Sequence, residues 1–201
     1  MNVKAKMKSI KRGVQHGFTL LELVVVVAIM GILIAIVAPS ISGSTDGSKA
    51  EMLLKVSNDI ASNWSLINQS CGTSSAVASN PIPASPNTAE NVVFAGSADV
   101  SATYTTCYAQ SKVLPMNEVA QAVSGTPDTY TIQGVPVAIT GGGASPLSVA
   151  FQNVPDSIAL LMAQHYQPTT TSVTAAVTAG PLSLPGSGAA GKQTVTLKKQ
   201  F

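Results

Sequence analysis

Charged and aromatic side chains are scarce in this chain, at 10% and 4% of its 201 residues. The charge-rich surface typical of a cytosolic enzyme is therefore not expected. Five of the eleven basic residues lie in the first seventeen positions (Lys4, Lys6, Lys8, Lys11 and Arg12), which leaves six basic against nine acidic residues, a net charge of −3, in the rest. Nucleic-acid binding requires a basic patch. We therefore do not expect the C-terminal part of the chain, residues 71–201, to bind nucleic acid directly.

Sequence motifs for catalysis or metal binding are also lacking. The chain has no CxxC, no HExxH and no cluster of His and Cys, and the carboxylates after residue 90 are scattered among predicted loops. His165 has no second ligand or nucleophile four residues further on, so a structural role is expected. The glycines at 141–143 lack the Lys and the helix of a phosphate-binding loop and indicate a turn. We predict no enzyme activity, no catalytic residue, no metal and no cofactor.

A long apolar run is what the sequence does contain. Residues 18–38 read FTLLELVVVVAIMGILIAIVA, and their only ionisable side chain is Glu22. As a helix they would span roughly 30 Å, the hydrocarbon thickness of a bilayer. The basic residues before the run should hold residues 1–17 in the cytoplasm. A secretory signal would have a shorter apolar stretch, with its cleavage site after it. The run therefore predicts a membrane anchor whose C-terminal part is exported.

Glu22 raises an energetic problem, because a carboxylate within a membrane-spanning run costs about 2.5–3.5 kcal/mol unless it is shallow, protonated or paired. A cut after Gly17 would make Phe18 a new N-terminus, about one helical turn before Glu22. The new ammonium could neutralise the carboxylate, within one chain or between neighbours.

Residues 17–39, GFTLLELVVVVAIMGILIAIVAP, resemble the signal of type IV prepilins. The resemblance implies that a membrane-embedded prepilin peptidase cuts after Gly17 and N-methylates Phe18. It also implies that Glu22 pairs with the terminal amine of an adjacent subunit and sets the stagger during assembly. Gly31 and Pro39 match positions where the helix of the family bends or loses hydrogen bonds, which suits residues that weaken a helix.

The resemblance implies a function and a location. The precursor would lie in the bacterial inner membrane, with its leader cytoplasmic and its head periplasmic, and would assemble on an inner-membrane platform into an extracellular homopolymer. The seventeen-residue leader and the mature length of 184 residues (201 minus 17) favour a b-type-like major pilin, although Phe18 is more typical of the a-type. The alternatives are a minor pilin, a type II secretion pseudopilin that primes a short periplasmic fibre, or a membrane-tethered binding module. Adhesion, motility, DNA uptake and conjugation stay open as tasks.

The predicted fold class is α+β, with one long helix packed on a mostly antiparallel sheet. We divide the chain into a removable leader (1–17), a filament-core helix (18–38), a hinge with an amphipathic continuation of the helix (39–70) and a β-rich head (71–201). Residues 40–48 should be a loosened joint, because two glycines disfavour regular helix. The helical pattern then resumes in an apolar stripe, which we expect to pack on the sheet (Leu53, Val56, Ile60, Trp64 and Ile67).

Cys71 and Cys107 are the only two cysteines. Because the head is expected in an oxidising compartment, they predict one disulfide rather than two free thiols. Cys107 falls in an alternating segment, 102–108, that predicts a strand, so the bridge should pin the helix end to the sheet.

Propensity and turn signals predict the remaining elements of the head. The composition of the Ser/Thr-rich loops is compatible both with O-glycosylation and with unmodified, solvated loops. Strands are expected at 91–95, 129–139, 147–152, 172–178 and 193–201, and short helices at 117–123 and 156–165.

Overall fold

A computed structural model describes residues 19–85, 88–124, 126, 128–142, 145–186 and 191–200, with only the backbone of 36–44, 142, 145 and 146. The chain divides into two compact units, Met1–Gly43 and Ser44–Phe201. Helix α1 (Leu20–Cys71) contributes its first part to the first unit and its second part to the second. The segment 40–48 is helical throughout, so the predicted loosening of the helix is wrong, although the boundary between the units falls at Gly43.

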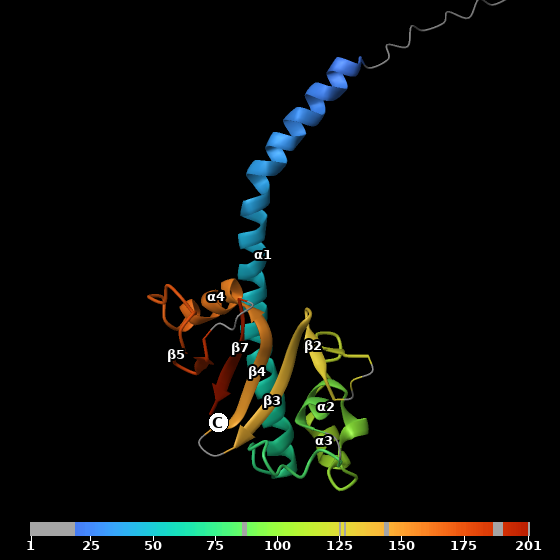
Figure 1. Cartoon of the computed structure of the whole chain (residues 1–201). Helices are drawn as coiled ribbons and strands as arrows, with labels where there is room; N and C mark the ends of the chain where they lie inside the picture. Colours follow the sequence, from blue (N-terminus) through green and yellow to red (C-terminus); the bar gives the residue numbers. More distant parts are fainter. Residues whose placement is uncertain are drawn as a thin grey trace, which may run out of the picture. The chain divides into compact units, whose positions relative to one another are not determined.

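The second unit is built on one antiparallel sheet of seven strands in the order β1-β2-β3-β4-β7-β6-β5 (Figure 1). The strands are β1 (Gln121–Ala122), β2 (Tyr130–Ile132), β3 (Val135–Gly142), β4 (Ser145–Pro155), β5 (Val177–Ala179), β6 (Leu182–Leu184) and β7 (Lys192–Lys199). The helices after α1 are α2 (Ala89–Phe94), the 3₁₀ turn η1 (Ser97–Asp99), α3 (Thr105–Ser111) and α4 (Asp156–Tyr166). The α+β class and the antiparallel sheet predicted from the sequence are confirmed.

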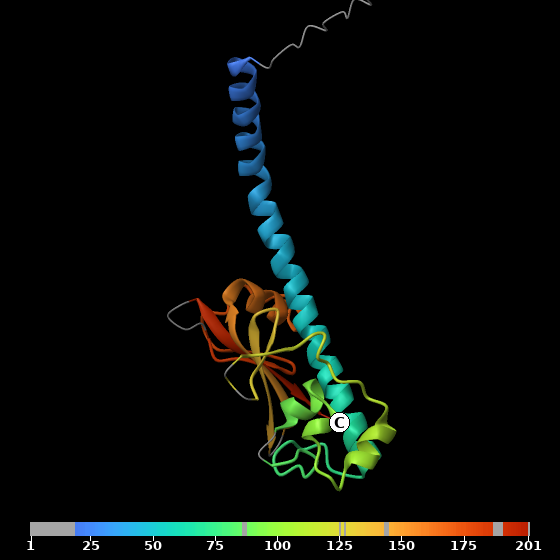
Figure 2. The same cartoon turned by 90° about the vertical axis from the view of Figure 1, so that its right-hand side faces the viewer.

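The core lies between the second part of α1 and one face of the sheet, along which α1 runs in both views (Figure 2). The predicted helical stripe is buried, with Ile60, Trp64 and Ile67 fully inaccessible. From the sheet, alternate residues of β4 and β7 enter the same hydrophobic cluster, while the residues between them are mostly partly exposed. One buried and one solvated face is the usual pattern of an antiparallel sheet.

Two local irregularities set the register of the central strands. Gln133 and Gly134 both have positive φ, which makes the two-residue turn that joins β2 to β3. The single strand predicted at 129–139 is therefore two. In β4 the register shifts between Phe151 and Val154, with Asn153 in the left-handed region, so that both Phe151 and Val154 are buried.

Several predicted elements are wrong, because tertiary contacts override local propensity. Residues 91–95 lie mostly in α2, where Thr88 donates its backbone N–H to the side-chain oxygen of Asn91 and so fixes the helix start. Residues 105–108 begin α3 rather than belonging to a strand. The segment 117–123 holds β1 instead of a helix, 172–178 is a strand only at its end, and β6 was not predicted. The strands at 147–152 and 193–199 and the helix at 156–165 are confirmed.

Candidate functional site

The candidate site predicted by the sequence lies at the start of α1. Gly17 and Phe18 lie outside the described residues, and Thr19 directly precedes the helix. Glu22 is in the first turn, and Gly31 and Pro39 lie further along the helix. A methyl group added at Gly31 would meet nothing within 4 Å, so nothing in the chain's own packing requires a glycine there.

Thr19 and Glu22 cap the helix reciprocally. The Oγ1 of Thr19 accepts the backbone N–H of Glu22 at 3.2 Å, and the Oε2 of Glu22 accepts the backbone N–H of Thr19 at 3.1 Å. The Thr19 hydroxyl also donates to Oε2, at 3.2 Å. This is a capping box, which satisfies N–H groups that have no partner inside the helix. The sequence analysis missed it, although Thr-x-x-Glu before an apolar run is its signature.

The capping box also fixes the place of the charge. The carboxylate of Glu22 is drawn back over the first turn, where the helix dipole favours an anion. Residue 18 directly precedes Thr19 in the chain. An amino group created at residue 18 would therefore lie one residue before the backbone N–H of Thr19, which donates a hydrogen bond to Glu22 Oε2. The local geometry thus holds the carboxylate at the end of the helix rather than along its side.

The helix after the capping box exposes apolar side chains all around its axis. Twelve large apolar residues between Leu20 and Ile34 are each 47–83% exposed. A soluble amphipathic helix would bury one stripe of them. Burial of each such side chain is worth about 1.5–3 kcal/mol, so the set represents on the order of 20 kcal/mol that only a covering environment can supply. Among the described residues, no helix is both long and apolar enough to cross a membrane.

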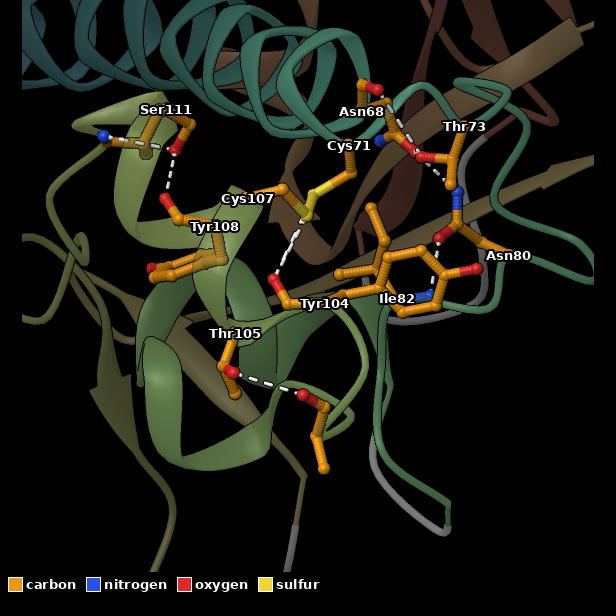
Figure 3. The surroundings of a disulfide bond; sticks show 12 residues. Asn68, Cys71, Thr73, Asn80, Ile82, Tyr104, Thr105, Cys107, Tyr108 and Ser111 are labelled. Atoms are coloured by element: carbon orange, nitrogen blue, oxygen red, sulfur yellow. Dashed lines mark hydrogen bonds between the residues drawn. A yellow bond between two sulfur atoms is a disulfide. The ribbon is translucent and has the colours of Figure 1, made fainter.

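The predicted disulfide joins Cys71 to Cys107 with a Cα–Cα distance of 5.0 Å (Figure 3). Cys71 is the last residue of α1, and Cys107 lies in α3, so the bridge fastens a helix and not the sheet. Near it, the buried side chain of Asn68 accepts hydrogen bonds from Thr73 Oγ1 at 2.6 Å and from Asn80 Nδ2 at 2.7 Å. The end of α1 is therefore tied both to α3 and to the loop that follows it.

The titratable side chains of the head are scattered in the part that the structure describes. His165 is exposed, and its nearest aromatic partner is the neighbouring Tyr166. No three His, Cys, Asp or Glu side chains within the described part of the chain are grouped so that they could hold a metal. Burial raises the pKa of Tyr130, and the nearby carboxylates of Asp99, Asp128 and Glu90 raise it further. This tyrosine is kept neutral, as a core residue would be.

A family model of the prokaryotic N-terminal methylation motif matches residues 12–38. No curated protein matches the chain significantly, and no solved structure does. The motif and the fold together define a class: an α+β protein that carries a type IV prepilin signal. The match supports a member of the type IV pilin family, a family of structural proteins, and confirms the resemblance found at residues 17–39.

Proposed function

We propose that the chain is a structural subunit of a type IV pilus, a b-type-like major pilin that is cut after Gly17 and methylated on Phe18. The observation that carries the proposal is the methylation motif at 12–38, which contains the start of a helix whose apolar side chains from Leu20 to Ile34 are exposed on every side. A motif of this kind needs a prepilin peptidase, and an exposed apolar helix needs a cover. Polymerisation through the helix supplies that cover.

In this proposal one helix serves two environments in turn. The sequence of residues 18–38 suits the bacterial inner membrane before assembly, with the leader in the cytoplasm and the head in the periplasm. After assembly on an inner-membrane platform, the same side chains pack against copies of the helix in an extracellular filament. The apolar surface stays out of water in both states, so transfer between them does not expose it.

Glu22 gives the assembly step its specificity. Its carboxylate lies over the first helical turn, and the cut after Gly17 creates an ammonium on the preceding segment. A charge at this depth is costly when unpaired. Pairing with the terminal amine of an adjacent subunit would favour one stagger of neighbouring helices over the others, and only processed chains would offer that amine.

The test is to shear filaments from cells that produce the chain, view them by electron microscopy and determine the mass of their main component. The proposal expects a dominant chain that begins at methylated Phe18 and contains one disulfide. Near absence of the chain from abundant filaments would indicate a minor pilin or a secretion pseudopilin. A chain that still begins at Met1 would indicate a membrane-tethered binding module and would overturn the proposal.

A further inference from the structure

A groove of 290 Å³ lies between α1 and α4 in the second unit. Ala50 and Leu54 of α1 and Leu161 of α4 line it, and Leu161 is 36% exposed. Gly47 also lines the groove, and a methyl group added there would meet nothing within 4 Å. A glycine inside a helix is less favourable than an alanine, and nothing in the chain's own packing accounts for this one. The groove therefore has apolar side chains in part of its wall and free space beside Gly47.

Polar side chains complete the lining of this groove, which we name the α1–α4 groove: Gln164 and His165 of α4, and the carboxylate of Glu51 of α1. Glu51 lines it and is exposed, one position after the buried Ala50. An occupant that suits the groove therefore has an apolar side chain for the space between Leu54 and Leu161 and a cation for Glu51.

The loop after α3, residues 112–116, carries that combination. Leu114 is 80% exposed, the most exposed large apolar side chain of the second unit among the described residues, and the exposed Lys112 lies two positions before it. An apolar side chain so far out in water gains from any contact that covers it.

The structure holds this loop in place from both sides. Lys112 ends α3 in the left-handed conformation, with its N–H bonded to the carbonyl of Ala109. After Leu114, Pro115 packs closely on Gly96: a methyl group added to Gly96 would lie 2.5 Å from the Pro115 ring. The N–H of Met116 also donates to the carbonyl of Val93 at 3.0 Å. A surface that is already ordered loses little entropy on binding.

The loop and the groove lie far apart along α1. The disulfide ties α3 to Cys71, the last residue of α1, whereas the groove involves Gly47 to Leu54. At 1.5 Å per residue, this separation is roughly 25–35 Å. A contact between two different patches of identical molecules is heterologous, and it propagates into a helical filament when it does not close.

We propose that in the filament Leu114 of one copy inserts into the α1–α4 groove of the next copy, where Lys112 faces Glu51. The inference rests on the proposed function, and it adds a head-to-head contact to the packing of the N-terminal helices. Charge complementarity with Glu51 and the match between an apolar side chain and the apolar part of the groove favour a second copy as the occupant.

The test is a charge exchange in the full-length chain, produced in cells that assemble it. Glu51→Lys and Lys112→Glu should each lower the yield of sheared filaments about five- to tenfold, because each replaces an attraction by a repulsion. The double variant should restore the yield. Asp59→Lys and Lys198→Glu, exposed charges outside both patches, are the matched controls and should leave the yield unchanged.

A second experiment reports the contact directly. With the native disulfide kept, Leu114→Cys combined with Leu161→Cys should give a ladder of covalent oligomers when filaments are oxidised, and neither single variant should.

The outcomes separate the inference from the function. The contact is overturned if both charge-reversal variants give the wild-type yield of filaments, or if the double variant does not restore the yield. Either result would leave the pilin function intact. Impaired assembly of Glu51→Lys without a cysteine ladder would show a different occupant of the groove and would also overturn it. Absence of the chain from any filament would refute the proposed function, and the inference with it.

Discussion

Glu22 caps the helix in this structure, and the role proposed for its charge can be separated from the cap by substitution. Its carboxylate completes the capping box with Thr19, and its charge is proposed to pair with a terminal amine. Glutamine at the same position keeps an oxygen for the Thr19 N–H but removes the charge, since Gln also serves in capping boxes. Thr19→Ala does the reverse, because it removes the hydroxyl and leaves the carboxylate.

The expected magnitudes differ widely. Loss of an N-cap side chain costs about 0.5–2 kcal/mol, so Thr19→Ala should fray the first turn and reduce filament yield severalfold. Glu22→Gln would leave a terminal ammonium unpaired in an apolar surrounding, at about 2.5–3.5 kcal/mol, which corresponds to about 70- to 400-fold. Filaments should therefore be reduced in Thr19→Ala and nearly absent in Glu22→Gln and Glu22→Ala.

The assay is the amount of subunit in sheared filaments, with the N-terminal mass of the cellular chain measured in parallel to show that cleavage still occurs. Asp59→Asn, an exposed carboxamide substitution on the same helix, is the control and should assemble normally. If Glu22→Gln assembles like the wild type while Thr19→Ala and Glu22→Ala fail together, the residue acts as a cap, and the argument from charge is refuted.

Three further predictions concern the head. Reduction of the Cys71–Cys107 disulfide, which closes a loop of 36 positions, should lower the free energy of unfolding by about 4 kcal/mol in denaturant titrations. A variant with serine at both positions is the control and should not respond to reductant. Equal stability of the wild type with and without reductant would contradict the prediction. Gly96→Ala should lower the melting temperature by several degrees, because φ is +95° and the new methyl would lie 2.5 Å from Pro115. Tyr130 has its pKa raised in the folded state, first by burial, so the unfolded state loses this proton first and stability should fall as pH rises above about 10. Tyr130→Phe should make that fall shallower in alkaline unfolding, and an unchanged slope would show that this hydroxyl does not contribute.

The N-terminal methylation motif was predicted from the sequence, and the family match at 12–38 supports it. The apolar run, its single carboxylate and the Gly-Phe junction lie within one continuous segment, and short-range chemistry is enough to connect them. The capping box was missed for a different reason. Its signature is only two residues, Thr19 and Glu22, whose spacing of three positions predicts reciprocal caps.

The head shows where local pattern fails. Residues 91–95 and 102–108 have the β-branched and aromatic content of strands, yet most of the first and half of the second are helical. In α2 the start is set by the Thr88–Asn91 hydrogen bond, and α3 is fastened by the disulfide to the end of α1. Strand propensity measures how well a residue fits a half-buried sheet, so it carries little weight where the partner is a helix.

The sequence by itself determined the N-terminal helix, its methylation motif, the amphipathic stripe that ends near Ile67 and the identity of the two bridged cysteines. Each of these depends on neighbours within a few turns or, for the cysteines, on there being only one possible pair. Only the tertiary structure decided the strand order, the short helices around the disulfide, and the placement of Leu114 and the α1–α4 groove at separate ends of the head. Those features arise from contacts between segments distant in the chain, whose energies no local pattern contains.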